Sequence, residues 1–197
     1  MQEIKIDVPD SVYAPLEDSR LLAKAAVQKC SGKILEMGCG SGFVCISLAK
    51  IKPDTKVIAC DINKAAVAAC KKNSKANRVR FKVFESDLFS SIEKGEKFDF
   101  ILFNPPYLPT EENEKVDGNL NFAFDGGKSG LEAAFRFLEE AGKYLKKGGK
   151  ILLVASSAAN LKGLHSKIRK CEFSYKIIGE ESFFFEKIYV YEVWRKE

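Results

Sequence analysis

The sequence predicts an α/β fold in which helices cover both faces of a mostly parallel, seven-stranded sheet. Short apolar runs of strand length alternate with helical patterns along most of the chain, as in parallel sheets with crossover helices. The last two strand-like runs have no helix between them, so we expect them to form an antiparallel pair. The predicted strands are Lys33–Met37, Thr55–Cys60, Val79–Glu85, Phe98–Phe103, Lys150–Ala155, Phe173–Ile178 and Lys187–Trp194.

Five helices are expected around these strands. Asn63 is a candidate N-cap for the third of them, and the pair Gly148-Gly149 is expected to follow the end of the fourth. Residues 104–128 show no regular pattern, which in a compact domain is typical of a functional loop, here a substrate loop. The predicted helices are Asp18–Lys29, Gly42–Lys50, Asn63–Ser74, Ser129–Lys146 and Leu161–Lys170.

Length and composition favour one globular domain. The 197 residues suit a single core over residues 1–197, with residues 1–30 forming a leading segment and helix. No apolar run is long enough to span a bilayer and the N-terminus carries no secretion signal, so we expect no membrane contact and a cytoplasmic location. The net charge of +5 permits an acidic partner without requiring one.

Cysteine and histidine usage argues against a metal site. The six cysteines form no C-x-x-C pair and there is one histidine, His165, so no clustered zinc ligands are expected. The single histidine also argues against Ser-His-Asp and Cys-His catalysis. We expect reduced thiols that act mostly as small buried apolar groups.

A glycine-rich turn follows the first predicted strand and suggests a nucleoside site. Glu36 leads into Gly38, Gly40 and Gly42, whose small size lets a ligand approach the backbone. Asp61 ends the second strand, where a carboxylate can accept both hydroxyls of a ribose. The spacing is G-x-G-x-G rather than the dinucleotide pattern G-x-G-x-x-G. The alternative is a tight turn without a ligand, which leaves both acidic residues unexplained.

Asp87 follows the third predicted strand and allows two interpretations. It can cap a short helix, or its carboxylate can accept a hydrogen bond from the exocyclic amine of an adenine bound at the same sheet edge. Both interpretations remain open from the sequence.

The motif after the fourth strand, Asn104-Pro105-Pro106-Tyr107, indicates chemistry on a planar amino group. A planar –NH2 donates two hydrogens in its plane, and the Asn104 side-chain oxygen and the Pro105 carbonyl could accept one each. Proline has no N–H to compete and it stiffens the loop. Tyr107 could cover the face of the planar group. The structural alternative is a turn in which Pro-Pro ends a strand.

These motifs together resemble the class I amino-methyltransferases, and within them the short HemK-type branch of archaea and eukaryotes. The segment Val12–Leu22 (VYAPLEDSRLL) is similar to that branch's leading motif, with Leu16 where alanine is usual and Ser19 where threonine is frequent. The segment Phe124–Gly130 (FDGGKSG) resembles the branch's Gly-Gly loop. The resemblance implies a Rossmann-like methyltransferase fold.

The resemblance also implies a cofactor, a substrate and a partner. The cofactor would be S-adenosyl-L-methionine and the substrate the glutamine side-chain amide (N5) in the Gly-Gly-Gln loop of a class I peptide chain release factor. The partner would be a small zinc-binding activator protein, with Val79–Glu85 an edge strand open to pairing. Cofactor contacts are assigned to Tyr13, Ser19, Glu36, Gly38, Gly40, Asp61, Asp87, Leu88 and Asn104, and target binding to Asn104, Pro105, Pro106 and Tyr107.

Two other functions compete with this assignment. One is a nucleic-acid amino-methyltransferase acting on adenine N6 or guanine N2, whose target nitrogens are also planar; base flipping normally needs a recognition domain that is not evident here. The other is a nucleotide-binding module without catalysis, for which Asn104–Tyr107 has no use. The segment Phe183–Phe185 is expected to belong to the core or its strands.

Overall fold

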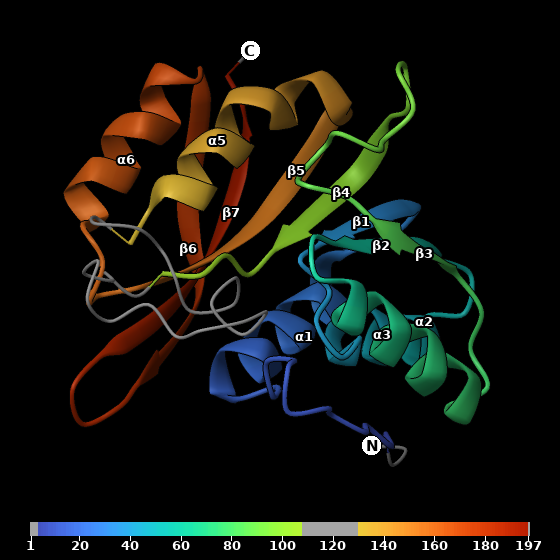
Figure 1. The fold of residues 1–197 in the computed structure, drawn as a ribbon. Coiled ribbons are helices and arrows are strands. Elements are labelled where there is room, and N and C mark those ends of the chain that lie inside the picture. The colour runs from blue at the N-terminus through green and yellow to red at the C-terminus, as the bar shows by residue number, and fades with distance from the viewer. Residues whose placement is uncertain (1–3, 108–129, 197) are drawn as a thin grey trace.

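The computed structural model describes residues 4–107 and 130–196 and contains a seven-stranded sheet in the order β3-β2-β1-β4-β5-β7-β6 (Figure 1). The predicted strand count and mostly parallel arrangement are confirmed. The strands are β1 (Lys33–Met37), β2 (Lys56–Asp61), β3 (Lys82–Glu85), β4 (Phe98–Phe103), β5 (Leu145–Ser156), β6 (Phe173–Ser182) and β7 (Lys187–Arg195).

The pairing changes direction only at the C-terminal end of the chain. Strands β3, β2, β1, β4 and β5 run parallel, whereas β7 pairs antiparallel with both β5 and β6. The expected antiparallel pair is therefore present, and it completes the sheet beside β5. Strand β3 lies at the other edge, as predicted.

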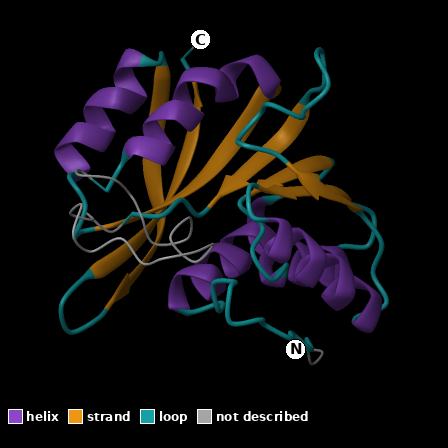
Figure 2. Ribbon diagram, viewed as in Figure 1, coloured by secondary structure: helices purple, strands orange, loops and turns teal. Residues whose placement is uncertain are grey.

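Helices cover both faces of the sheet, as Figure 2 shows. On one face lie α1 (Glu17–Lys29), α2 (Phe43–Ile51) and α3 (Lys64–Ala76), and on the other α5 (Glu132–Ala141) and α6 (Leu161–Lys170) (Figure 1). Successive strand residues alternate between the two cores: buried Ile34 packs in the α1–α3 layer and its neighbour Leu35 in the α5–α6 layer. This period of two is the pattern of a strand buried on both faces.

One predicted helix was too long. The helix expected over Ser129–Lys146 ends at Ala141 and is followed by a short 3-10 turn, Gly142–Tyr144. Leu145 then starts β5, pairs with Phe98 and is buried. Tyr144 stacks on Phe89 with 4.5 Å between ring centroids. Tertiary packing of Tyr144 and Leu145 therefore ends the helix before its local sequence pattern does.

Other boundaries also differ. Strand β3 begins at Lys82 rather than Val79, because Arg78 has a left-handed φ of 58° and Val79 still hydrogen-bonds to Ser74 of the preceding helix. Strand β6 extends to Ser182, four residues beyond the predicted end at Ile178. Most of the predicted substrate loop (residues 108–128) and the segment similar to the Gly-Gly loop, up to Ser129, lie outside the described residues.

The placement of Phe183–Phe185 in the core was wrong. Phe184 and Phe185 are each 93% exposed and Phe183 is 38% exposed, at the turn between β6 and β7. Aromatic residues are favoured in strands and in cores alike, so the sequence pattern did not distinguish a buried strand from a projecting hairpin turn.

Three buried asparagines fasten the leading segment to α3. Asn77 exchanges hydrogen bonds with the backbone of Lys5 (3.0 and 2.6 Å), and Asn73 does the same with Asp7 (3.0 and 2.8 Å). Asn63 donates to the Ser11 carbonyl at 2.9 Å and, as predicted, caps α3. The side chain of Asn73 also donates to the Ser41 carbonyl at 2.9 Å, in the glycine-rich turn. The leading segment is thereby held beside that turn.

Within the described residues, no helix is long and apolar enough to cross a membrane. Residues 4–107 and 130–196 also contain no group of three His, Cys, Asp or Glu side chains arranged to hold a metal ion.

We predict that Asn73→Ala lowers the free energy of unfolding by about 1–3 kcal/mol, because the buried Ser41 carbonyl and the backbone of Asp7 lose the hydrogen bonds of this side chain. Urea denaturation monitored by circular dichroism measures this change. The matched control is Lys72→Ala, which removes only an exposed ion pair with Asp7 at 2.6 Å and should change stability by less than about 0.5 kcal/mol. Equal effects of the two substitutions would contradict the proposed anchoring by Asn73.

Candidate active site

A cavity of about 480 Å³ opens at the carboxyl ends of β1, β2 and β4. The strand order reverses between β1 and β4, the place where open α/β sheets bind ligands. Its volume lies within the range of small-molecule sites. The cavity brings together every residue predicted for the site: Tyr13, Ser19, Glu36, Gly38, Gly40, Asp61, Asp87, Leu88, Asn104, Pro105, Pro106 and Tyr107.

The glycine-rich turn is fixed by Asp61. One carboxylate oxygen of Asp61 accepts the Gly40 N–H at 2.8 Å and the other accepts the Asn63 N–H at 2.8 Å. Gly40 and Gly42 have φ values of 52° and 89°, which favour glycine. A Cβ on Gly42 would lie 2.7 Å from the Cys70 sulfur. The end of β2 therefore holds the turn that leads from β1 into α2.

Glu36 is a buried carboxyl group with unused hydrogen-bonding capacity. Its side chain is 4% exposed and its Oε2 atom has no partner. Burial raises the pKa of Glu36 to about 8, and burial likewise raises the pKa of Asp61. Two acidic groups at adjacent strand ends, one with a free buried oxygen, are suited to a ligand that presents hydroxyl donors.

Asp87 and Leu88, which come shortly after the end of β3, also line the cavity. The Asp87 carboxylate forms an ion pair with Arg136 of α5 at 2.8 Å. Leu88 has a left-handed φ of 46° and is buried. The Arg136 contact was not expected from the sequence, and the role of Asp87 toward an adenine stays a prediction.

The carboxylate of Asp18 connects three other side chains that line the cavity. A single oxygen of this buried residue accepts hydrogen bonds from the Tyr13 hydroxyl, the Asn104 side-chain nitrogen and the Tyr107 hydroxyl, each at 3.0 Å. The other oxygen accepts from Ser19. From the sequence, Asp18 is expected only to start a helix. The available signal was an acidic residue next to Ser19 in the leading motif, but it did not reveal which distant side chains it would contact.

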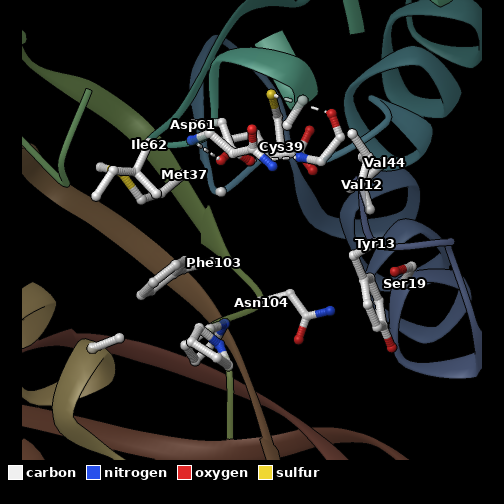
Figure 3. A pocket seen from close by; sticks show the side chains of 18 of the residues that line it. Val12, Tyr13, Ser19, Met37, Cys39, Val44, Asp61, Ile62, Phe103 and Asn104 are labelled. Carbon is white, nitrogen blue, oxygen red and sulfur yellow. Dashed lines mark hydrogen bonds between the residues drawn. The ribbon is translucent and has the colours of Figure 1, made fainter. Parts of the chain in front are cut away.

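Asp18 determines how the Asn104 amide is oriented. A carboxylate can only accept, so the amide nitrogen of Asn104 must face Asp18. The amide oxygen of Asn104 is then left buried without a partner. Burial, with a further contribution from Asp18, raises the pKa values of the Tyr13 and Tyr107 hydroxyls, so both remain protonated donors. In Figure 3, Asn104 lies between Phe103 and Tyr13, across the cavity from Asp61.

Several apolar side chains of the cavity wall were not predicted. Val12, Met37, Ile62 and Phe103 line the cavity, as Figure 3 shows. A mainly apolar wall with a few directed polar groups is typical of cofactor sites.

The sheet order, the glycine-rich turn and the acidic strand ends define a Rossmann-like protein with a nucleoside-type cavity. Comparison with known proteins identifies the family. The chain belongs to the methyltransferase small domain family, whose model matches residues 16–178. The predicted Rossmann-like methyltransferase fold and family resemblance are confirmed.

Relatives and neighbouring structures agree with this family. A Methanocaldococcus jannaschii protein, provisionally assigned as a protein N5-glutamine methyltransferase, is 44% identical over 195 residues, covering 99% of this chain and 98% of its own. Ribosomal RNA small subunit methyltransferase C of Escherichia coli is 32% identical over 139 residues, covering 71% of this chain and 35% of its own. The structure of the E. cuniculi Mtq2–Trm112 complex, described as methylating the termination factor eRF1, has a TM-score of 0.73 at 20% identity and covers 94% of this chain and 99% of that chain.

We predict that Glu36→Gln makes the protein progressively more stable than the wild type as pH rises from about 4.5 to about 8. Because the pKa of Glu36 is raised on folding, the folded state keeps a proton that the unfolded state has lost in this window. Wild-type stability therefore falls there, at up to about 1.4 kcal/mol per pH unit, while a glutamine does not titrate. Chemical denaturation at several pH values measures the difference.

Glu85→Gln provides the control, since it removes one carboxyl group from an exposed strand-end position. A profile for Glu36→Gln that runs parallel to that of the wild type would show that Glu36 is not a buried neutral acid.

Proposed function

We propose that this chain is an S-adenosylmethionine-dependent N-methyltransferase acting on the side-chain amide nitrogen (N5) of the glutamine in the Gly-Gly-Gln loop of a class I peptide chain release factor. One observation carries the proposal: Asp18 fixes Asn104 so that its amide oxygen is buried, unpartnered and available for an amino group. A site that only bound a nucleoside would not need this oriented acceptor.

The residues present fit the cofactor. Glu36 has a free buried oxygen and Asp61 lies at the next strand end, so both can receive ribose hydroxyls. Gly38 and Gly40 leave room beside the turn, and Asp87 with Leu88 would flank the adenine. Tyr13 and Ser19 of the leading segment and α1 would also contact the cofactor. When bound, S-adenosylmethionine supplies a methyl group on a positively charged sulfur.

The acceptor nitrogen would be held by the segment after β4. The Asn104 oxygen and the Pro105 carbonyl would accept one amide hydrogen each. Pro106 limits the backbone, and Tyr107 is fixed through its hydroxyl to Asp18 at 3.0 Å. These residues act by positioning, and well-aligned geometry can contribute about 7–11 kcal/mol to such a reaction.

A glutamine amide needs this arrangement because its nitrogen lone pair is delocalised into the carbonyl. Hydrogen bonds from both N–H groups to protein oxygens increase the electron density on nitrogen, provided that the amide oxygen is left free. The low-dielectric surroundings of the buried Asn104 oxygen strengthen this effect.

The choice of substrate is supported by the relatives. The archaeal relative that matches nearly end to end carries a glutamine-N5 assignment, and the structure with a TM-score of 0.73 belongs to an enzyme described as acting on a termination factor. The runner-up is a base amino group in nucleic acid, favoured by the match to the ribosomal RNA enzyme, of which this chain spans about a third.

We also propose that this chain works with a small protein partner. In the neighbouring structure Mtq2 forms a complex with Trm112, and we propose that this chain likewise pairs with a small zinc-binding activator in a cytoplasmic heterodimer. Strand β3 is an edge strand, so its outer backbone groups are available to a partner strand. We further propose that residues 1–197 act as a single methyltransferase domain.

We predict that Asp18→Asn lowers kcat for methyl transfer by about 10²-fold, while the dissociation constant for S-adenosylmethionine changes much less. The asparagine can donate, so the Asn104 amide is free to turn its oxygen toward residue 18 and its N–H groups toward the acceptor. Steady-state kinetics and calorimetry measure the two quantities. Glu17→Gln removes an equal charge from the exposed neighbouring position and should stay within about twofold of the wild type. Near-normal kcat for Asp18→Asn would remove Asp18 from the mechanism.

The substrate is tested by competition. The enzyme receives equal amounts of release factor, its Gly-Gly-Gln Gln→Ala variant, and adenine-containing DNA and RNA, with labelled S-adenosylmethionine, both with and without a small zinc-binding activator. We predict label on the wild-type factor alone. Label on the nucleic acids with none on the factor would favour the runner-up function.

A further inference from the structure

The turn of the β6–β7 hairpin presents two phenylalanines almost completely to solvent. Phe184 and Phe185 are each 93% exposed, and their rings contact edge to face with 4.7 Å between centroids. We call Phe183–Phe185 the aromatic tip. A pair of adjacent aromatic rings exposed to this degree is unfavourable in water and often marks an interaction site.

The aromatic tip is held in place rather than loosely attached. Ser182 pairs with Lys187, and the Phe183 N–H donates to the Glu186 carbonyl at 2.7 Å. Backbone and side chain of Ser157 exchange hydrogen bonds with the Lys187 backbone at 2.8 Å each, and the Ser156 hydroxyl donates to the Glu186 carboxylate. The hairpin backbone that carries the rings is therefore fixed, so it loses little conformational freedom on binding.

The hairpin turn lies at the edge of the sheet where the cavity opens, which is also the edge that carries the proposed acceptor site. Ser156, the last residue of β5, pairs with Ile188, so the turn extends past the carboxyl end of β5 (Figure 1). Tyr107 packs against the same apolar cluster as Ile188. Burial and then Asp18 raise the pKa of Tyr107, and Glu186 of the hairpin adds a smaller contribution to this rise.

The charges around the aromatic tip select the kind of partner. Glu180, Glu181 and Glu186 flank it, against one lysine, Lys187, which pairs with Glu180 at 3.1 Å. This is an acidic surface on a chain of net charge +5. Negative charge beside exposed rings disfavours phosphate backbones and anionic lipid headgroups, and favours a protein surface with an apolar pocket and basic rim.

We propose that the aromatic tip docks the acceptor protein, with Phe184 and Phe185 entering an apolar pocket on that protein outside its methylated loop. This inference rests on the proposed function and deepens it, because it separates recognition of the whole protein from recognition of the glutamine. Aromatic side chains in such positions supply much of the binding energy of protein interfaces.

The test compares two acceptors, the intact class I release factor and a short synthetic peptide containing Gly-Gly-Gln. The double substitution Phe184→Ser with Phe185→Ser is expected to raise KM for the intact factor by about tenfold or more, with kcat within about twofold and the peptide kinetics unchanged. Ile51→Ser is the matched control, since Ile51 is also an exposed apolar residue (46%) and ends α2 away from the cavity. It should leave both acceptors unaffected.

Each other outcome overturns the docking proposal in a recognisable way. An unchanged KM for the factor, while the wild type still methylates it, removes the aromatic tip and leaves the proposed function intact. Equal losses with factor and peptide show that the hairpin supports the site instead. Loss of binding to phosphatidylserine vesicles, or of self-association in sedimentation, assigns the tip to a membrane or a second copy. Failure of the wild type to methylate either acceptor, both with and without the zinc-binding activator, rejects the proposed function itself.

Discussion

The organisation of the site depends on one buried oxygen of Asp18. It accepts three hydrogen bonds at 3.0 Å, from Tyr13 in the leading segment and from Asn104 and Tyr107 after β4. Because a carboxylate accepts and cannot donate, it imposes one orientation on each of these partners. The Asn104 oxygen is thereby kept free for a ligand, and Tyr107 is fixed beside it. Removing this acceptor would leave three donors to reorganise.

The surrounding fold keeps Asp18 where these contacts are possible. Asn63, Asn73 and Asn77 fasten the leading segment along α3, and Asn73 also reaches the glycine-rich turn. Asp61 holds that turn from the end of β2. The leading segment and the sheet therefore connect the proposed cofactor residues with the proposed acceptor residues. The sheet places both sets at the reversal of strand order.

Local sequence patterns predicted most of this architecture, and the failures have physical causes. Apolar runs located all seven strands because both sheet faces are buried, as Ile34 and Leu35 illustrate. The role of Asp18 could not be predicted, since Asn104 and Tyr107 lie 86 and 89 residues away along the chain. Helix α5 ended early because Leu145 pairs with Phe98, another distant residue. The aromatic tip was assigned to the core because its composition is that of a buried strand.

The proposed chemistry requires Asn104, oriented by Asp18, to receive the amino group of the substrate. The most direct measurement is a crystal structure with S-adenosylhomocysteine and a Gly-Gly-Gln peptide. We predict that the glutamine amide nitrogen lies within hydrogen-bond distance of the Asn104 side-chain oxygen and the Pro105 carbonyl, with the Asn104 nitrogen still on Asp18. A glutamine bound elsewhere, or an Asn104 amide turned away from Asp18, would contradict this claim.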